Sequence, residues 1–119
     1  MSIAKPLPHD AAALHVNGSA RYVDDIPTPT GTLHLAFGTS PIAAGTLNGM
    51  DLDAVRSATG VISVMTADDL QHDTDVSPSA HDEPLLAKDT VAYVGQPMFL
   101  VIATSHTAAR AAARRAQYD

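Results

Sequence analysis

The chain of 119 residues contains no cysteine, and only 4% of its residues are aromatic. The lack of cysteine excludes disulfides, thiolate zinc sites, thiol nucleophiles and ligands for iron–sulfur clusters from this segment. It also fits a reducing compartment, so we expect cytoplasmic residence. With so few aromatic rings, the core has to be built from Val, Leu, Ile, Met and Ala side chains.

Long apolar runs and an excess of positive charge are missing as well. No segment approaches the roughly 18 consecutive apolar residues of a membrane-spanning helix, so we expect no membrane span. The first ten residues hold Lys5 but no apolar run, so no secretory signal is expected there. The formal net charge is −6, and an acidic chain gains little from phosphate contacts, so we expect no nucleic-acid partner.

The length of the chain fits one compact domain, and its apolar pattern predicts an α+β fold with a mixed β-sheet and short helices. Residues 1–17 have no periodicity and are expected to form an extended N-terminal arm. Residues 18–119 are expected to form the domain itself. Because the chain stops directly after an alanine-rich helix, we expect it to be a piece of a longer protein.

The predicted strands follow from apolar alternation and apolar runs. Residues 32–37 alternate, with Leu33, Leu35 and Phe37 on one face, which indicates a half-buried strand. The apolar run 98–103 predicts a central strand. Three further segments complete the predicted β-structure: a weaker strand over 46–50, a buried strand over 61–65, and a hairpin of 85–87 and 91–94 around 88–90.

Two short helical segments are predicted from their capping residues. Asp51 is expected to cap a helix over 52–57 that Gly60 closes. Thr66 and Asp69 resemble a capping box, with Asp in place of Glu, for one further helical turn.

A longer helix is predicted near the end of the chain, capped by Thr104 or Ser105. Its alanines recur at helical spacing and predict a smooth, close-packing face; they are Ala108, Ala109, Ala112, Ala113 and Ala116. Arg110 and Arg114 lie four residues apart, next to Arg115. These cations either meet an acidic partner or form a solvated face near the end of the helix that favours positive charge.

The segment from Gln71 to Pro84 is predicted to be a loop, and it contains imidazole and carboxylate groups of the kind that bind divalent metals. They are His72, Asp73, Asp75, His81, Asp82 and Glu83. Because their spacing matches no closed metal motif, a solvated surface loop is the favoured interpretation and a metal site is the alternative.

Two other polar features are weighed in the same way. Asp24 and Asp25 point to opposite sides if the chain is extended, so a turn in which they accept backbone N–H bonds is favoured over a shared proton. In the bend at residues 95–97, Gln96 either presents its amide to a ligand or bonds local backbone. The chain has no nucleophile elbow and no phosphate-binding loop. The residues therefore assign no catalytic, cofactor-binding or metal-binding site.

A series of motifs, taken in order, resembles a known family. The motifs span residues 5–10, 15–27, 33–37, 60–70 and 91–97, followed by the alanine-rich helix 108–113 and the pair Tyr118-Asp119. In this order they resemble the opening of the molybdenum-binding subunit of xanthine dehydrogenases, in the molybdenum hydroxylase family that also includes the aldehyde oxidases. The resemblance covers nearly the whole chain.

The resemblance implies an α/β-hammerhead domain, and it implies the activity of the complete enzyme. That enzyme would oxidise xanthine or hypoxanthine to urate at molybdopterin-bound molybdenum and pass electrons through iron–sulfur clusters to FAD and NAD. The implied partners are the downstream molybdopterin-binding domains and an iron–sulfur/flavin subunit. The family's catalytic and cofactor residues would lie beyond Asp119, so this chain alone is expected to be inactive and architectural.

The subfamily and the function class leave alternatives open. Residues 8–10 and 73–78 are more similar to the xanthine type, while an aldehyde oxidase type remains the alternative. Within the complete enzyme the domain is expected to help shape the substrate channel, and Gln96 is the residue singled out for that role. Two alternatives come from other function classes. One is a free-standing acidic interaction module that uses the acidic loop or the arginine face. The other is a small metal-dependent enzyme built on His72 to Glu83.

Overall fold

We analysed a computed structural model, which describes residues 3–72 and 74–119. The chain forms two units, residues 1–30 and residues 31–119. The first unit carries α1 (Ala12–Val16) and the 3₁₀ turn η1 (Val23–Asp25). In chain order, the elements of the second unit are β1 (His34–Thr39), β2 (Gly45–Thr46), β3 (Met50–Asp51), α2 (Asp53–Arg56), β4 (Val61–Thr66), η2 (Ala67–Asp69), β5 (Thr90–Val91), β6 (Pro97–Ala103), α3 (His106–Ala113) and β7 (Gln117–Tyr118).

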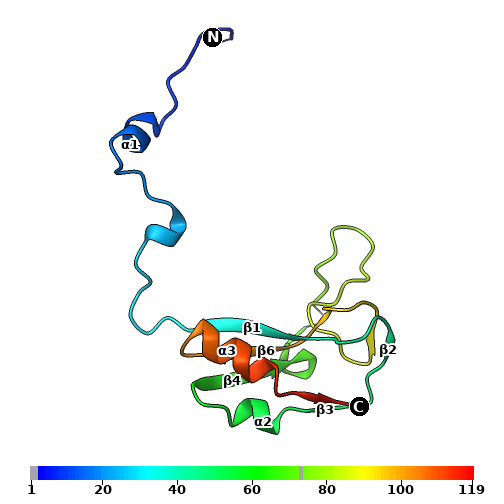
Figure 1. The fold of residues 1–119 in the computed structure, drawn as a ribbon. Coiled ribbons are helices and arrows are strands. Elements are labelled where there is room, and N and C mark those ends of the chain that lie inside the picture. Colours follow the sequence, from blue (N-terminus) through cyan, green and yellow to red (C-terminus); the bar gives the residue numbers. More distant parts are fainter. Residues whose placement is uncertain (1–2, 73) are drawn as a thin grey trace. The chain divides into compact units, whose positions relative to one another are not determined.

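The main sheet consists of three antiparallel strands in the order β1-β6-β4 (Figure 1). His34 pairs with Ala103 at one end of the β1–β6 ladder, and Val64 pairs with Val101 across β4 and β6. The apolar run that predicted a central strand is β6, and this prediction is confirmed. The α+β class with a mixed arrangement of short strands and helices is likewise confirmed.

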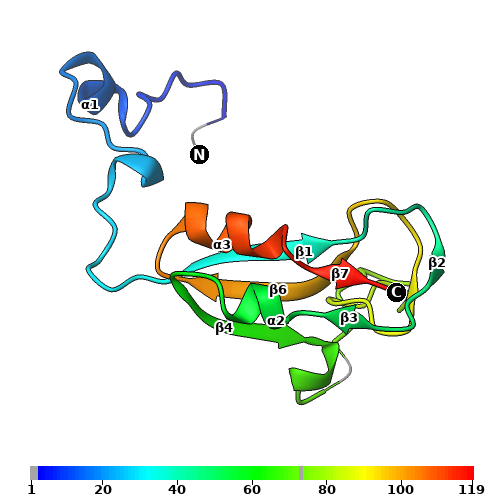
Figure 2. The same ribbon diagram turned by 60° about the horizontal axis from the view of Figure 1, so that its bottom comes forward.

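One face of this sheet, called the inner face, packs against α3 and forms the core (Figure 2). Phe99 and Val101 of β6 are fully buried there. On β1 the small residues Ala36 and Gly38 share this face. The Phe99 ring lies directly over Gly38, because a Cβ atom built at Gly38 would be 2.0 Å from Cε1 of that ring. The predicted alanine face of the last helix is buried at Ala109, Ala112 and Ala113.

The opposite face of the sheet, called the outer face, is also apolar but is partly open to solvent. Leu35 is 53% exposed and Phe37 is 48% exposed. Their cross-strand partners on β6 are Ile102 and Leu100. The alternation predicted for residues 32–37 is therefore present, but its large apolar side chains lie on the face away from α3. The close packing of the helix requires the small residues of β1 on the inner side, so size rather than hydrophobicity decides which face is buried.

Two ribbons of two strands each extend the domain, and they correct two predictions. The predicted hairpin over 85–94 does not form, because β5 pairs with β2 instead. The weak strand predicted over 46–50 is divided between β2 and β3, and β3 pairs with β7. Each ribbon joins segments far apart in sequence, and the pairing of such short strands leaves no periodic signal in the sequence.

The local capping predictions agree with the structure except at the start of α2, where the N-cap position is Leu52 and Asp51 bonds the helix from the residue before it. Asp51 Oδ1 accepts a hydrogen bond from the Asp53 N–H at 3.0 Å, at the start of α2. Gly60 follows α2 with a φ of +84°, a conformation that favours glycine. At η2 the Asp69 carboxylate accepts a 2.7 Å bond from the Thr66 N–H and a 3.0 Å bond from the Thr66 hydroxyl. These contacts form the predicted capping box.

The first unit contains short turns and many exposed side chains. Residues 12–16 form a single turn of helix where extended backbone was expected. The Asn17 N–H donates to the Ala13 carbonyl at 3.2 Å and closes this turn. This turn was not predicted because a helix of five residues is too short to show an apolar period. None of the helices within residues 3–72 and 74–119 has the length and apolar composition needed to cross a membrane.

Candidate functional site

Gln96, the residue singled out for a possible ligand, lies immediately before β6 and is only 5% exposed. Its side-chain oxygen accepts a hydrogen bond from the Ala92 N–H at 2.7 Å. Its backbone carbonyl accepts from the Ser40 N–H at 2.9 Å, while the Ser40 carbonyl accepts from the Gly95 N–H at 2.9 Å. The side-chain amide of Gln96 thus closes the bend, and backbone bonds connect the bend to Ser40 at the end of β1. This is the local-backbone alternative predicted for Gln96.

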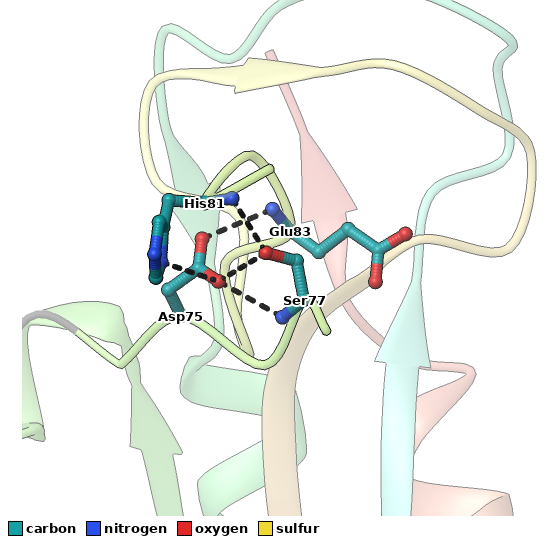
Figure 3. Close-up of polar contacts among 4 residues, drawn as sticks. All are labelled: Asp75, Ser77, His81 and Glu83. Atoms are coloured by element: carbon teal, nitrogen blue, oxygen red, sulfur yellow. Dashed lines mark hydrogen bonds and ion pairs between the residues drawn. The ribbon is translucent and has the colours of Figure 1, made fainter. Parts of the chain in front are cut away.

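The loop predicted over residues 71–84 is ordered around Asp75 (Figure 3). Asp75 Oδ1 accepts bonds from the Ser77 hydroxyl at 2.6 Å and the Ser77 N–H at 2.9 Å, and Oδ2 accepts from the Glu83 N–H at 3.2 Å. His81 Nδ1 lies 3.8 Å from Oδ1. The bond from the Ser77 side chain is the main reason why the pKa of Asp75 is lowered; burial acts in the opposite direction. Asp75 therefore acts as the anchor of a turn.

The possible metal ligands of this loop are not brought together. In the part of the chain that the structure describes, no three His, Asp or Glu side chains gather in a way that would hold a metal ion. Asp73, one of the predicted candidates, lies outside the described residues. The Asp75 oxygens are occupied by N–H and O–H donors, and Figure 3 shows the Glu83 carboxylate pointing away from Asp75. The arrangement is that of a hydrogen-bonded turn.

Asp24 and Asp25 form part of η1 in the first unit. The Asp25 carboxylate accepts a 2.9 Å hydrogen bond from the Tyr22 N–H. This is the capping of a turn that was favoured over a shared proton. Asp25 therefore serves the local backbone.

An open pocket of about 480 Å³ lies between residues 67–74 and 84–90. Its walls include Leu70, Leu86 and Lys88, and Lys88 Nζ forms an ion pair with Asp68 at 2.5 Å. The hydrogen bond that Lys88 donates to the Asp68 carboxylate raises the pKa of Lys88, so its amine stays protonated and is no nucleophile. This pair was missed at the sequence level because its members are distant in sequence and carry no motif beyond their opposite charges.

The remaining predicted cations lie on the exposed side of α3. Arg110 and Arg114, together with His106, line a shallow groove of about 260 Å³. The groove holds no carboxylate and no hydroxyl paired with a base, so it supports binding of an anion rather than catalysis.

Comparison with known proteins identifies the family to which the chain belongs. A family profile described as "Aldehyde oxidase and xanthine dehydrogenase, a/b hammerhead domain" matches residues 17–119. The chain belongs to this family. Its hammerhead domain is 37% identical to xanthine dehydrogenase 1 of Arabidopsis thaliana over 88% of the chain, and 39% identical to aldehyde oxidase 1 of Rattus norvegicus over 94% of the chain. The aligned part is 8% of each relative, so the chain spans a small part of their length.

The hammerhead fold is also shared with a solved enzyme structure. The aldehyde oxidoreductase from Desulfovibrio gigas superposes with a TM-score of 0.81 at 30% identity, covering 94% of this chain and 14% of that one. The ordered motifs quoted from the sequence therefore identified the family correctly. Similarity to both xanthine and aldehyde enzymes leaves the substrate type open within the family.

Among residues 3–72 and 74–119, every buried side-chain nitrogen or oxygen has a hydrogen-bond partner within the domain. Gln96, the one buried amide at a bend, already accepts a bond from Ala92. No reaction step is assigned to these residues.

Proposed function

We propose that this chain is the N-terminal structural domain of the large subunit of a xanthine dehydrogenase. The complete enzyme would hydroxylate xanthine or hypoxanthine to urate and would contain molybdopterin, iron–sulfur clusters, FAD and NAD. Xanthine dehydrogenases of Arabidopsis thaliana and Oryza sativa are among its relatives, at 37% and 34% identity. Such an enzyme would work in the cytoplasm, a reducing compartment with which a chain free of cysteine is compatible.

The outer face of the sheet is the observation that carries the structural role. We define the outer patch as Leu35, Phe37, Met65, Leu100 and Ile102, which alternate with the inner-face residues on β1, β4 and β6. A sheet whose second face stays in water normally places polar side chains there. Here the side chains that alternate away from α3 are mostly apolar, which is typical of a face that another layer covers.

The occupant we propose for the outer patch is the set of downstream domains of the same subunit. Relatives of this chain are about tenfold longer than the aligned region, which makes up 8% of their length. The iron–sulfur/flavin subunit would then contact the assembled large subunit. An apolar contact of this kind contributes roughly 25 cal/mol for each Å² of apolar surface removed from water.

An aldehyde oxidase type is the second candidate, and one specific observation favours it. Aldehyde oxidase 1 of Rattus norvegicus is 39% identical to the chain, slightly more than the xanthine dehydrogenases named above. The two candidates share the structural role of the domain and differ only in the substrate of the complete enzyme.

The structural role is tested by producing the chain in cells that make the molybdenum cofactor. We expect no co-purified molybdenum by elemental analysis and no xanthine-dependent dye reduction, because every buried polar side-chain atom among the described residues already has a hydrogen-bond partner. Stoichiometric molybdenum, or turnover that disappears in Glu83→Gln, would contradict the proposal.

The substrate type is tested on the enzyme that contains this chain. An antibody raised against the 119-residue chain isolates that enzyme from its source cells, and the purified enzyme is assayed with xanthine and with benzaldehyde. We expect faster turnover with xanthine, and reduction of NAD. Faster turnover with benzaldehyde would instead support the aldehyde oxidase type, and failure to isolate any oxidoreductase would count against both.

A further inference from the structure

The exposed side of α3 carries positive charge in a chain that is otherwise acidic. The formal net charge is −6, yet no Asp or Glu occurs between Thr90 and Tyr118. Arg110, within α3, and Arg114, its C-terminal cap, lie one helical turn apart and are exposed. With His106 at the start of the helix they line one groove of about 260 Å³. The segment between Thr90 and Tyr118 is therefore cationic, and it contains α3.

These cations are not used by the domain itself. Lys88 and Arg56, the other basic residues of the second unit, pair with Asp68 at 2.5 Å and with Asp53 at 4.0 Å. Within the described part of the chain, no ion pair is formed by the basic residues at the end of the chain, namely Arg110, Arg114 and Arg115. Their guanidinium groups are therefore available to another molecule.

The structure of α3 does not depend on these side chains. The helix packs through Ala109, Ala112 and Ala113, and its N-terminal cap is Ser105, whose hydroxyl accepts a bond from the Ala108 N–H at 3.1 Å. The helix dipole favours a cation near the C-terminal end. It does not account for both arginines lining the same groove, whose lining residues include no carboxylate.

We propose that the face formed by His106, Arg110 and Arg114 binds an acidic segment of a partner protein. A guanidinium group binds a carboxylate through two parallel N–H bonds, which makes arginine well suited to such contacts. Side chains one helical turn apart are separated by about 6 Å. Carboxylates on alternate residues of an extended chain are separated by about 7 Å. An extended segment with acidic residues at alternate positions therefore matches the spacing of the two arginines.

A nucleic acid fits this face less well than an acidic protein segment. A duplex carries one charge per about 1.7 Å of its axis, so it would run beyond the short helix toward the acidic remainder of the domain. The groove residues are His106, Thr107, Arg110, Ala111 and Arg114, which offer no Phe, Tyr or Trp ring on which bases would stack. This interaction surface is separate from the outer patch, so it does not rest on the proposed function.

The proposal is tested with the 119-residue chain and a fluorescein-labelled peptide that has Glu at alternate positions. Anisotropy at low ionic strength measures the affinity of the chain for this peptide. We expect the double variant Arg110→Glu with Arg114→Glu to bind at least about tenfold more weakly, and binding to weaken with added salt. Circular dichroism verifies that the variant is folded, and Arg110→Gln with Arg114→Gln provides a second, milder variant.

A matched control separates a specific site from the effect of total charge. Lys5→Glu with Arg21→Glu changes the net charge by the same amount, but both residues lie in the first unit. This control should bind the peptide nearly as well as the unmodified chain. An equal loss in both double variants would overturn the proposal, as would equal affinity for a peptide with Gln in place of Glu. Tighter binding of a DNA duplex than of the acidic peptide would also overturn it.

Discussion

Phe99 on the inner face of the main sheet is fully buried, whereas Phe37 on the outer face remains 48% exposed although it lies on the neighbouring strand. Both faces carry apolar side chains, and both are formed by the same three strands. The difference arises from α3, whose alanines cover the inner face at close range. The burial of an apolar side chain is thus decided by what packs on it, and the two faces should respond differently to substitution.

The largest effect is expected from Phe99→Ala on the inner face. Removing the buried ring should lower the free energy of unfolding by about 3–5 kcal/mol, because the transfer energy of the ring is lost and a cavity remains. Urea denaturation followed by circular dichroism measures this loss. An effect no larger than that of Phe37→Ala on the outer face would contradict the assignment of the faces.

Gly38→Ala should destabilise the inner face by about 1–3 kcal/mol, because the new methyl group overlaps the Phe99 ring. The strand conformation itself tolerates alanine, since Gly38 does not have a positive φ. In a Phe99→Ala background the same substitution should lower the free energy of unfolding much less, because the overlap with the ring is removed. A double-mutant cycle in urea measures the coupling. Additive costs would show that Gly38 and Phe99 do not meet.

Gly38 and Phe99 also show which parts of the fold could be predicted from the sequence alone. The central strand, the capping box at Thr66 and the alanine face of the last helix follow from local periodicity and capping chemistry, and they agree with the structure. Leu35 and Phe37 were correctly placed on one face, while Leu33, predicted to share it, lies just before β1. Their exposure was not predictable, because it depends on the contact between Gly38 and a ring far along the chain. The ribbons were missed for the same reason.

The candidate sites were predictable to the extent that their chemistry is local. The bend at Gln96 and the turn at Asp25 use backbone groups within a few residues, and the sequence indicated both alternatives for them. The ion pair between Lys88 and Asp68 depends on tertiary structure. The sequence therefore indicated which side chains are polar, and the fold decides which of them meet.

On the outer face we expect a small effect on stability and a large effect on association. Leu35→Thr with Phe37→Thr should change the free energy of unfolding by less than about 1 kcal/mol, because both side chains are half exposed and Thr favours strands. Self-association of the chain should fall, since the outer patch loses much of its apolar surface. Light scattering across a concentration series measures this. The substitution of two exposed residues of the first unit, Val16→Thr with Val23→Thr, is the matched control.

The smallest effect is expected outside the sheet, at Asp75. Its folded pKa is lowered by the bond from Ser77, so its contribution to stability is present above the unfolded pKa of about 3.9. This contribution is lost as the pH falls through the lower folded pKa. Faster amide exchange at Ser77 and Glu83 should appear in that window and not at Val101. Asp75→Asn should remove this pH dependence, and its persistence would assign it to another carboxylate.

The strand order has a consequence for how the chain acquires its fold. β6 is the central strand, but it comes after both β1 and β4 in the sequence. During synthesis the two edge strands, β1 and β4, leave the ribosome before β6, their partner in this sheet, has been made. They therefore emerge as apolar segments with unpaired edges. Ladders between such distant segments close slowly because the intervening chain must first be ordered. We therefore expect the nascent domain to need chaperones until β6 emerges, and we expect refolding in the test tube to be slow and sensitive to concentration.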